Sequence, residues 1–315
     1  MALAREAVLI SRQLDDMPEL AGSLGNLATR LSELGDAASR TEALACAREA
    51  LTIHQQLAGN EPPFFLRDLA FSFQNLSERL RGGEDDDAFR GEALNCMSEA
   101  VSIWRELAER QSEAVLSNLA YALDRLGVLS QSPADKLNYG REAIAIFRQL
   151  AEHEPGMYLA NLAVSLANLA QTLTKQGQPD LDRESLSCTY EATEIFRRLA
   201  DSQPGVHLPY LAKSLRQLAQ IAPDKAEGLR YAREAMQIYH RLIGPDPTGS
   251  LVFDFISSLF GLSTHLSAHE AAIPPAEALE CARELLQMYA PFYVKWPDDF
   301  NDVTKAAADI LKRLE

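Results

Sequence analysis

The chain has 315 residues, of which 47% are hydrophobic, and its formal net charge is -15 at pH 7. This charge argues against a nucleic-acid partner, because phosphate binding is driven by clustered Lys and Arg, and it favours a basic or neutral partner. No 18 apolar residues follow one another without a charge, and the N-terminus lacks a secretory pattern, so we expect a cytoplasmic protein with no membrane partner.

One helix pattern recurs seven times along the chain. Its marker is a Glu followed by Ala or Leu, with Ile or Met four residues later and Leu or Phe eight residues later. Offsets of +1, +4 and +8 share one helix face. The glutamates are Glu6, Glu49, Glu99, Glu142, Glu191, Glu234 and Glu284. We name the predicted helices that carry them B helices, and the first covers residues 2–14.

A second helix pattern, which we name the A helix, lies between successive B helices. It is aligned on a Leu with apolar neighbours at helical spacing. The aligned leucines are Leu27, Leu76, Leu126, Leu169, Leu218 and Leu262. Helix breakers fall between the patterns, with Pro62, Pro155, Pro204 and Pro247 before A helices and Gly35, Gly82 and Gly177 after them. The chain is therefore predicted to alternate between the two kinds of helix throughout.

Such short helix pairs cannot bury their apolar faces alone, so neighbouring pairs must complete each other's core. Residues 165–173 (SLANLAQTL) and 141–147 (REAIAIF) resemble tetratricopeptide repeats. The similarity is to the long variety found in kinesin light chains and in arrays attached to signalling NTPases. The short repeat's Trp-x-x-Leu-Gly signature is absent, and the period exceeds ~34 residues. The resemblance extends over nearly the whole chain.

The resemblance implies an all-α fold, a right-handed α-solenoid whose A helices line the concave surface. We expect about six helix pairs plus unpaired terminal helices, in one solenoid spanning 1–315. Residues 286–315 form an expected C-terminal capping segment, introduced by the aromatic residues Tyr289, Phe292, Tyr293, Trp296 and Phe300. The alternative is that this aromatic segment docks another subunit or domain.

The first B helix has no A helix before it, which predicts an uncovered apolar edge. Either the sequence is a fragment of a longer array, or this edge is covered by another copy or by other domains of a parent chain.

The position three residues before the B-helix Glu distinguishes two kinds of repeat. Four repeats carry Cys there, namely Cys46, Cys96, Cys188 and Cys281. The other two carry Tyr139 and Tyr231, and their A-to-B turns are predicted to be six or seven residues shorter. We infer that the larger ring fills the space that a shorter turn leaves, and that the thiols are buried and free.

The residue after the B-helix Glu predicts close helix approach. It is Ala7, Ala50, Ala100, Ala143, Ala192 and Ala235, with Leu285 in the last copy. A larger side chain at these positions would overpack the interface.

Polar residues recur on one face of the A helices, beside the apolar stripe. An amide side chain both donates and accepts hydrogen bonds, which suits the backbone of an extended peptide, and charged neighbours would select among peptides. The candidate groove residues are Ser23, Asn26, Arg30, Ser72, Asn75, Arg79, Arg125, Asn161, Ser165, Asn168 and Gln217. The alternative is that these side chains are solvated or bond the adjacent repeat.

The remaining polar features are interpreted as structural. The B-helix glutamates are expected to bond neighbouring backbone or Arg groups, with an acidic ladder for a basic partner as the alternative. The acidic run at 84–87 is expected to be a solvated loop. His265 and His269 stand four residues apart beside Glu270, but without a third ligand they are expected to be surface histidines.

No catalytic motif is present, so we expect no enzyme activity, cofactor or metal. The function predicted from the sequence is a scaffold that binds a protein or peptide in its concave groove. Two alternatives stay open: a sensing or oligomerising arm of a larger signalling protein, and a metal-dependent enzyme acting through His265.

Overall fold

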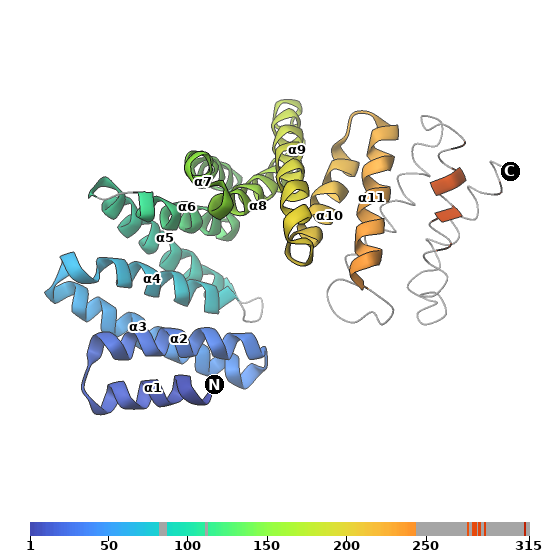
Figure 1. Cartoon of the computed structure of the whole chain (residues 1–315). Helices are drawn as coiled ribbons and strands as arrows, with labels where there is room; N and C mark the ends of the chain where they lie inside the picture. The colour runs from blue at the N-terminus through green and yellow to red at the C-terminus, as the bar shows by residue number, and fades with distance from the viewer. Residues whose placement is uncertain are drawn as a thin grey trace. The chain divides into compact units, whose positions relative to one another are not determined.

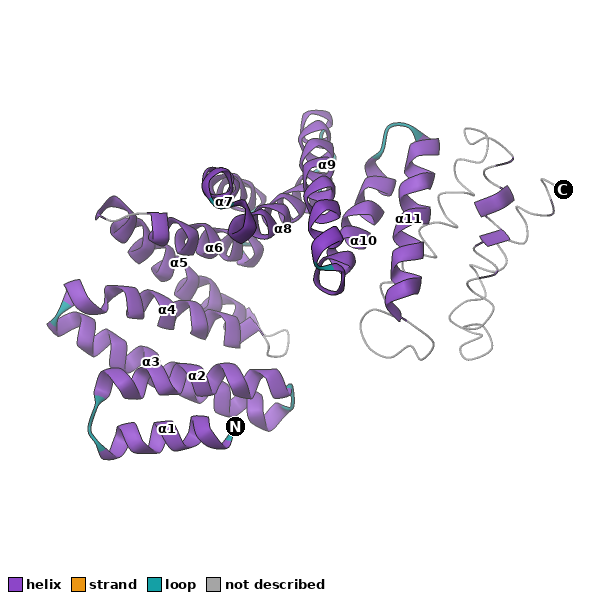
Figure 2. Cartoon of the chain, in the orientation of Figure 1, coloured by secondary structure: helices purple, strands orange, loops and turns teal. Residues whose placement is uncertain are grey.

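The structure is a computed structural model that describes residues 1–81, 87–110 and 113–243, together with residues 276, 279–281, 283, 284, 287 and 312. Every regular element in these segments is a helix, as Figure 2 shows, and the predicted all-α class is confirmed. The chain divides into two compact units, Met1–Tyr158 and Leu159–Glu315.

The helices alternate in the predicted order (Figure 1). The B helices are α1 (Ala2–Gln13), α3 (Ala37–Asn60), α5 (Asp87–Arg110), α7 (Pro133–His153), α9 (Pro179–Ser202) and α11 (Lys225–Ile243). The A helices are α2 (Met17–Leu34), α4 (Pro62–Arg81), α6 (Glu113–Leu129), α8 (Pro155–Thr174) and α10 (Pro204–Ile221).

Within each unit, helices that are consecutive in the sequence pack against one another. In the first unit the consecutive contacts run from α1 to α7, and the A helix α2 also touches the next A helix, α4. In the second unit α9 packs on α10 and α10 on α11. This consecutive pairing is the packing of a helical-repeat solenoid and confirms the predicted architecture.

Local signals explain where the helices begin and end. Pro62, Pro155 and Pro204 each occupy the first position of an A helix, where the missing N–H is not needed. Gly35 ends α2 in the left-handed conformation, with φ of 74°, which a residue with a Cβ adopts only at a cost. The side chain of Ser132 caps α7 by accepting a hydrogen bond from the backbone N–H of Asp135.

The aligned positions form the core, as predicted. Leu27, Leu76, Leu126, Leu169 and Leu218 are all exposed by 4% or less. The alanines that follow the B-helix glutamates are also buried, except Ala7, which is half-buried. Trp104 of α5 is completely buried, and its Nε1 donates a 3.0 Å hydrogen bond to Oε1 of Gln74 on α4. This bond satisfies the one polar atom of the indole ring.

The sequence predicted that the turns before α7 and α11 are shorter than the other A-to-B turns, and this is wrong. The connections between α6 and α7 and between α10 and α11 are no shorter than the one between α2 and α3. Instead, the B helices α7 and α11 begin nine residues before their aligned glutamates, Glu142 and Glu234, whereas α3, α5 and α9 begin twelve residues before theirs. The missing residues therefore come mainly from the helix ends that meet at the connection.

Several predicted features lie outside the described residues and stay predictions. They are the aligned Leu262, Leu285, the helix breakers Gly82 and Pro247, the acidic residues 84–86, the histidine pair His265 and His269 with Glu270, and nearly all of the capping segment 286–315. The extent of a single solenoid over 1–315 also stays a prediction. Among the helices that are described, none is both long and apolar enough to cross a membrane.

Candidate functional site

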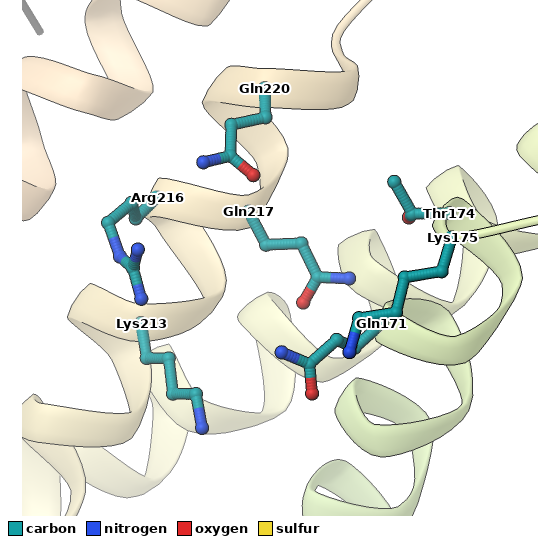
Figure 3. Close-up of a pocket in the computed structure, with 7 residues that line it drawn as sticks. All are labelled: Gln171, Thr174, Lys175, Lys213, Arg216, Gln217 and Gln220. Atoms are coloured by element: carbon teal, nitrogen blue, oxygen red, sulfur yellow. The ribbon is translucent and has the colours of Figure 1, made fainter. Parts of the chain in front are cut away.

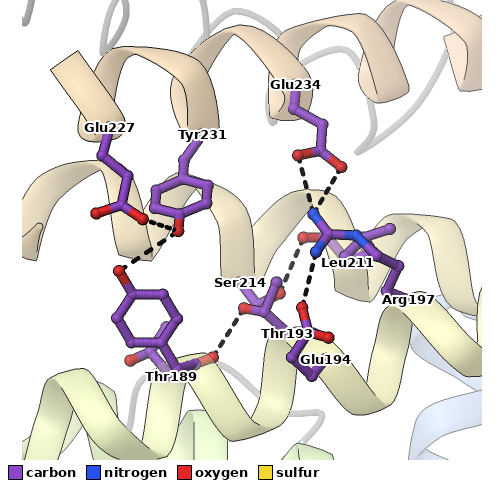
Figure 4. Close-up of polar contacts among 10 residues, drawn as sticks. Thr189, Thr193, Glu194, Arg197, Leu211, Ser214, Glu227, Tyr231 and Glu234 are labelled. Carbon is purple, nitrogen blue, oxygen red and sulfur yellow. Dashed lines mark hydrogen bonds and ion pairs between the residues drawn. The ribbon is translucent and has the colours of Figure 1, made fainter.

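Ion pairs connect successive B helices. Arg105 of α5 reaches Glu142 of α7 at 2.7 Å, and Arg197 of α9 reaches Glu234 of α11 at 2.9 Å (Figure 4). Arg12 bonds Glu49 and Arg233 bonds Glu284 in the same way. The structural interpretation of these four glutamates is confirmed. Most of these side chains are substantially exposed, so each pair contributes only about 0–1 kcal/mol.

None of the four cysteines forms a disulfide, and three of the four are buried. Burial, together with the nearby Glu92 and Glu99, raises the pKa of the Cys96 thiol to about 11, although Arg48 opposes this shift. The thiol is therefore protonated at neutral pH and a poor nucleophile or metal ligand. Within the described segments no three His, Cys, Asp or Glu side chains are grouped as a metal site would require.

The two tyrosines that replace cysteine pack differently. Tyr139 is half-buried against the core of the first unit, and its Cβ would lie 3.5 Å from a Cβ added at Gly127 on α6. Tyr231 instead meets Tyr190 of α9 edge to face at 6.1 Å between ring centroids, and its hydroxyl donates to Glu227 at 2.6 Å (Figure 4). The predicted role, in which the tyrosine ring fills space in the helix interface, fits Tyr139 better than Tyr231.

A groove runs between the A helices α2 and α4 of the first unit, and we name it the amide groove. Its volume is about 320 Å³. It is lined by Ala21, Gly22, Gly25, Asn26, Thr29, His54, Asp68, Phe71, Ser72 and Asn75. Three of the predicted residues, Asn26, Ser72 and Asn75, therefore come together here.

The amide groove combines polar and aromatic surface. Asn26 and Asp68 are exposed and Asn75 is half-buried. A Cβ at Gly25 would lie 3.8 Å from Nδ2 of Asn75, which is an ordinary van der Waals distance, so the Asn75 amide lies beside α2. The Phe71 ring, 37% exposed, is held edge to face against the buried Trp104 at 4.9 Å between ring centroids.

A buried hydrogen bond forms the floor of the amide groove. Nδ1 of His54 on α3 lies 2.6 Å from Oγ of Ser72 on α4. Burial lowers the pKa of His54, although the charge of Asp68 opposes this effect. The imidazole is therefore neutral at pH 7. Sequence reasoning missed His54 because it lies on a B helix, outside the A-helix stripe.

The predicted serines are buried, and a role in binding stays a prediction. Ser23, Ser72 and Ser165 are exposed by 5% or less, so they lie in helix interfaces and offer a ligand almost no surface. These serines occupy the position three residues before the predicted Asn, and side chains at this position face the neighbouring helix. A small hydroxyl side chain there permits close packing of the helices.

The other predicted residues lie apart from the amide groove. Arg125 of α6 bonds Asp124 at 2.7 Å and lies 5.6 Å above the Tyr121 ring. Arg30 and Asn161 are exposed, while Arg79 and Asn168 are half-buried. Arg30 forms an exposed ion pair with Glu33 at 3.9 Å. None of these residues lines the amide groove, although all lie on A helices.

A second groove, which we name the cationic groove, lies between α8 and α10 in the second unit (Figure 3). Its volume is about 190 Å³. It is lined by Gln171, Thr174 and Lys175 of the α8 end and by Lys213, Arg216, Gln217 and Gln220 of α10. Of these residues only Gln217 was predicted. The predicted polar stripe follows one row of positions along each A helix, whereas Lys213 and Arg216 lie in the adjacent row of α10.

Comparison with known proteins supports the repeat interpretation. Residues 20–64, which include α3 and most of α2, match the family model described as tetratricopeptide repeat. The structure is similar to that of BtubC (BKLC) from P. vanneervenii, with 17% identity and a TM-score of 0.53 over 79% of this chain and 90% of that one. Nro1, described as a nuclear import adaptor, aligns with 12% identity and a TM-score of 0.47 over 90% of this chain and 93% of its own. A search of curated protein sequences finds no match.

Proposed function

We propose that this chain, a helical-repeat protein of the tetratricopeptide type, is a scaffold that binds an extended segment of a partner protein and performs no chemistry. The observation that supports this most directly is the amide groove, where Asn26 and Asn75 from successive A helices open onto one surface. Repeat folds of this kind generally act through such surfaces.

The side chains of the amide groove suit a peptide of broad sequence with a basic preference. Asn26 and Asn75 can each donate to and accept from a peptide backbone, which has both groups at every residue. Asp68 supplies a negative charge at the rim, and Phe71 supplies an apolar contact that Trp104 holds in place. The net charge of -15 would further steer a basic partner toward the chain.

The experiment is an affinity capture with three forms of the full chain. These are the wild type, the Asn26→Ala/Asn75→Ala variant and the control Gln55→Ala, which changes an exposed amide on the B helix α3. We expect proteins that are captured by the wild type and the control but lost with the double variant, at an unchanged melting temperature. Identical captured sets for all three forms would refute the amide groove as the binding surface, and a fall in melting temperature would show a structural role for the asparagines.

A second candidate function, an oligomerising arm, rests on a different surface. Helix α1 and its C-cap residue expose Leu9 by 58%, Ile10 by 48% and Leu14 by 71%, on a face that also carries the exposed Glu6 and Gln13. If this face contacts another copy, light scattering will show a mass that rises with concentration and falls to that of a monomer in Leu9→Ser/Leu14→Ser. A monomer at every concentration of the wild type would rule this candidate out.

We place the scaffold in the cytoplasm. None of its four cysteines forms a disulfide, and thiols persist in a reducing compartment. Fractionation of cells that express the full chain tests this location directly.

A further inference from the structure

The cationic groove of the second unit concentrates positive charge on an acidic chain. Lys175 of the α8 end and Lys213 and Arg216 of α10 line it, and no Asp or Glu does. Elsewhere the described arginines are commonly paired, as Arg197 is with Glu234. In the part of the chain that the structure describes, Lys175, Lys213 and Arg216 form no ion pair. Three positive charges therefore face one small space without compensation.

The base of the cationic groove also contains unsatisfied donors. Arg216 and Gln217 are half-buried, and Nε of Arg216 and Nε2 of Gln217 are buried without a hydrogen-bond partner among the described residues. Buried donors are usually paired, and these two can bond acceptor oxygens of a ligand. The hydroxyl of Thr174 is already bonded to Ala170 and Ser185, so it forms part of the wall.

The surrounding residues define how a ligand would enter. Lys175, Lys213, Gln171 and Gln220 are exposed, whereas Arg216 and Gln217 are half-buried. Figure 3 shows Gln217 of α10 extending toward Gln171 and Lys175, while Arg216 lies near Lys213 along α10. A ligand from solvent would meet the lysines first and the Arg216 and Gln217 donors last.

We propose that the cationic groove binds a phosphorylated side chain of a partner protein, which deepens and rests on the proposed scaffold function. A phosphoryl group carries a charge of about -1.5 to -2 and three acceptor oxygens, which matches several cations and amide donors around one centre. The Arg216 guanidinium can bind it with two N–H groups, and the lysines act as point charges. A volume of about 190 Å³ accommodates one such group.

The test uses the full chain and three labelled peptide pools that differ only at the centre, which is phosphoserine, a Glu-Glu pair or serine. We expect fluorescence anisotropy to show tightest binding of the phosphoserine pool, and at least about tenfold weaker binding by Lys213→Glu/Arg216→Glu. The control Arg198→Glu changes an exposed Arg on α9 in the same unit and should bind like the wild type.

Two outcomes would overturn the proposal. One is a serine or Glu-Glu pool that binds as tightly as the phosphoserine pool, and the other is an equal loss in Arg198→Glu. The neutral variant Lys175→Gln/Lys213→Gln repeats the comparison if the charge reversal lowers the melting temperature. The Asn26→Ala/Asn75→Ala variant should still bind the phosphoserine pool, so failure of the amide groove and failure of the cationic groove are distinguishable.

Discussion

His54 shows how a single buried residue couples this fold to pH. Its imidazole is bonded to Ser72 beneath the amide groove, and burial lowers its pKa below the usual 6.5 while Asp68 opposes the shift. The unfolded chain therefore binds this proton more tightly than the folded chain does. The stabilisation from neutral His54 is complete above about pH 6.5 and is lost as the pH falls through 6.5 toward the lower folded value.

We predict that urea unfolding of the wild type shows lower stability at pH 5.5 than at pH 7.5, with part of the difference due to His54. The variant His54→Gln should show a smaller difference, because it has no proton to bind there. The control His153→Gln, at an exposed position of α7, should keep the wild-type difference. An unchanged pH dependence in His54→Gln would contradict this account.

Tyr139 gives a second prediction at the scale of one residue. The ring is half-buried against the core of the first unit, so Tyr139→Cys should leave a cavity and lower the free energy of unfolding by about 2 kcal/mol. Denaturant titration measures this. The control Phe64→Cys, at a ring that is 74% exposed, should change stability by less than about 0.5 kcal/mol. Equal stability of Tyr139→Cys and the wild type would show that the ring fills no space.

At the scale of the element, the helical hairpin depends on small residues where helices meet. Ala143 of α7 is completely buried, whereas Ala145 of the same helix is exposed. We predict that Ala143→Leu costs about 1–3 kcal/mol through overpacking. Ala145→Leu should be nearly neutral, since both residues favour helix. A comparable cost for both variants in thermal unfolding would mean that helix packing is not the cause.

The helices, their order and their core faces could be predicted because they depend on local periodicity. The aligned leucines and the buried alanines repeat at fixed offsets, and proline marks three A-helix starts. The shortening of α7 and α11 could not be located, because a spacing between two patterns does not say whether a turn or a helix end has lost residues.

The candidate site was predicted only in part. Asn26 and Asn75 share the amide groove because equivalent positions of successive A helices lie side by side. Ser23 and Ser165 turned out to be buried, since a row of helix positions can tilt from the surface into the interface. The Lys and Arg residues of the cationic groove do not recur at the equivalent positions of the other repeats. The repeat pattern therefore could not predict them.

At the scale of the whole molecule, the chain carries two chemically different grooves, which we propose to be recognition surfaces. The amide groove of the first unit has the carboxylate of Asp68 at its rim, and the cationic groove of the second unit has Lys175, Lys213 and Arg216. The two grooves favour ligands of opposite charge. A partner with both a basic and a phosphorylated segment could use both, which raises the affinity by effective concentration.

The central claim is that a partner protein lies on the A-helix face. It is tested most directly by placing a photo-crosslinking amino acid at position 75, in the amide groove, or at position 55, on the exposed surface of the B helix α3. We predict that irradiation in a cell lysate links a partner protein to the chain from position 75 and not from position 55. Crosslinking from position 55 with none from position 75 would contradict the account.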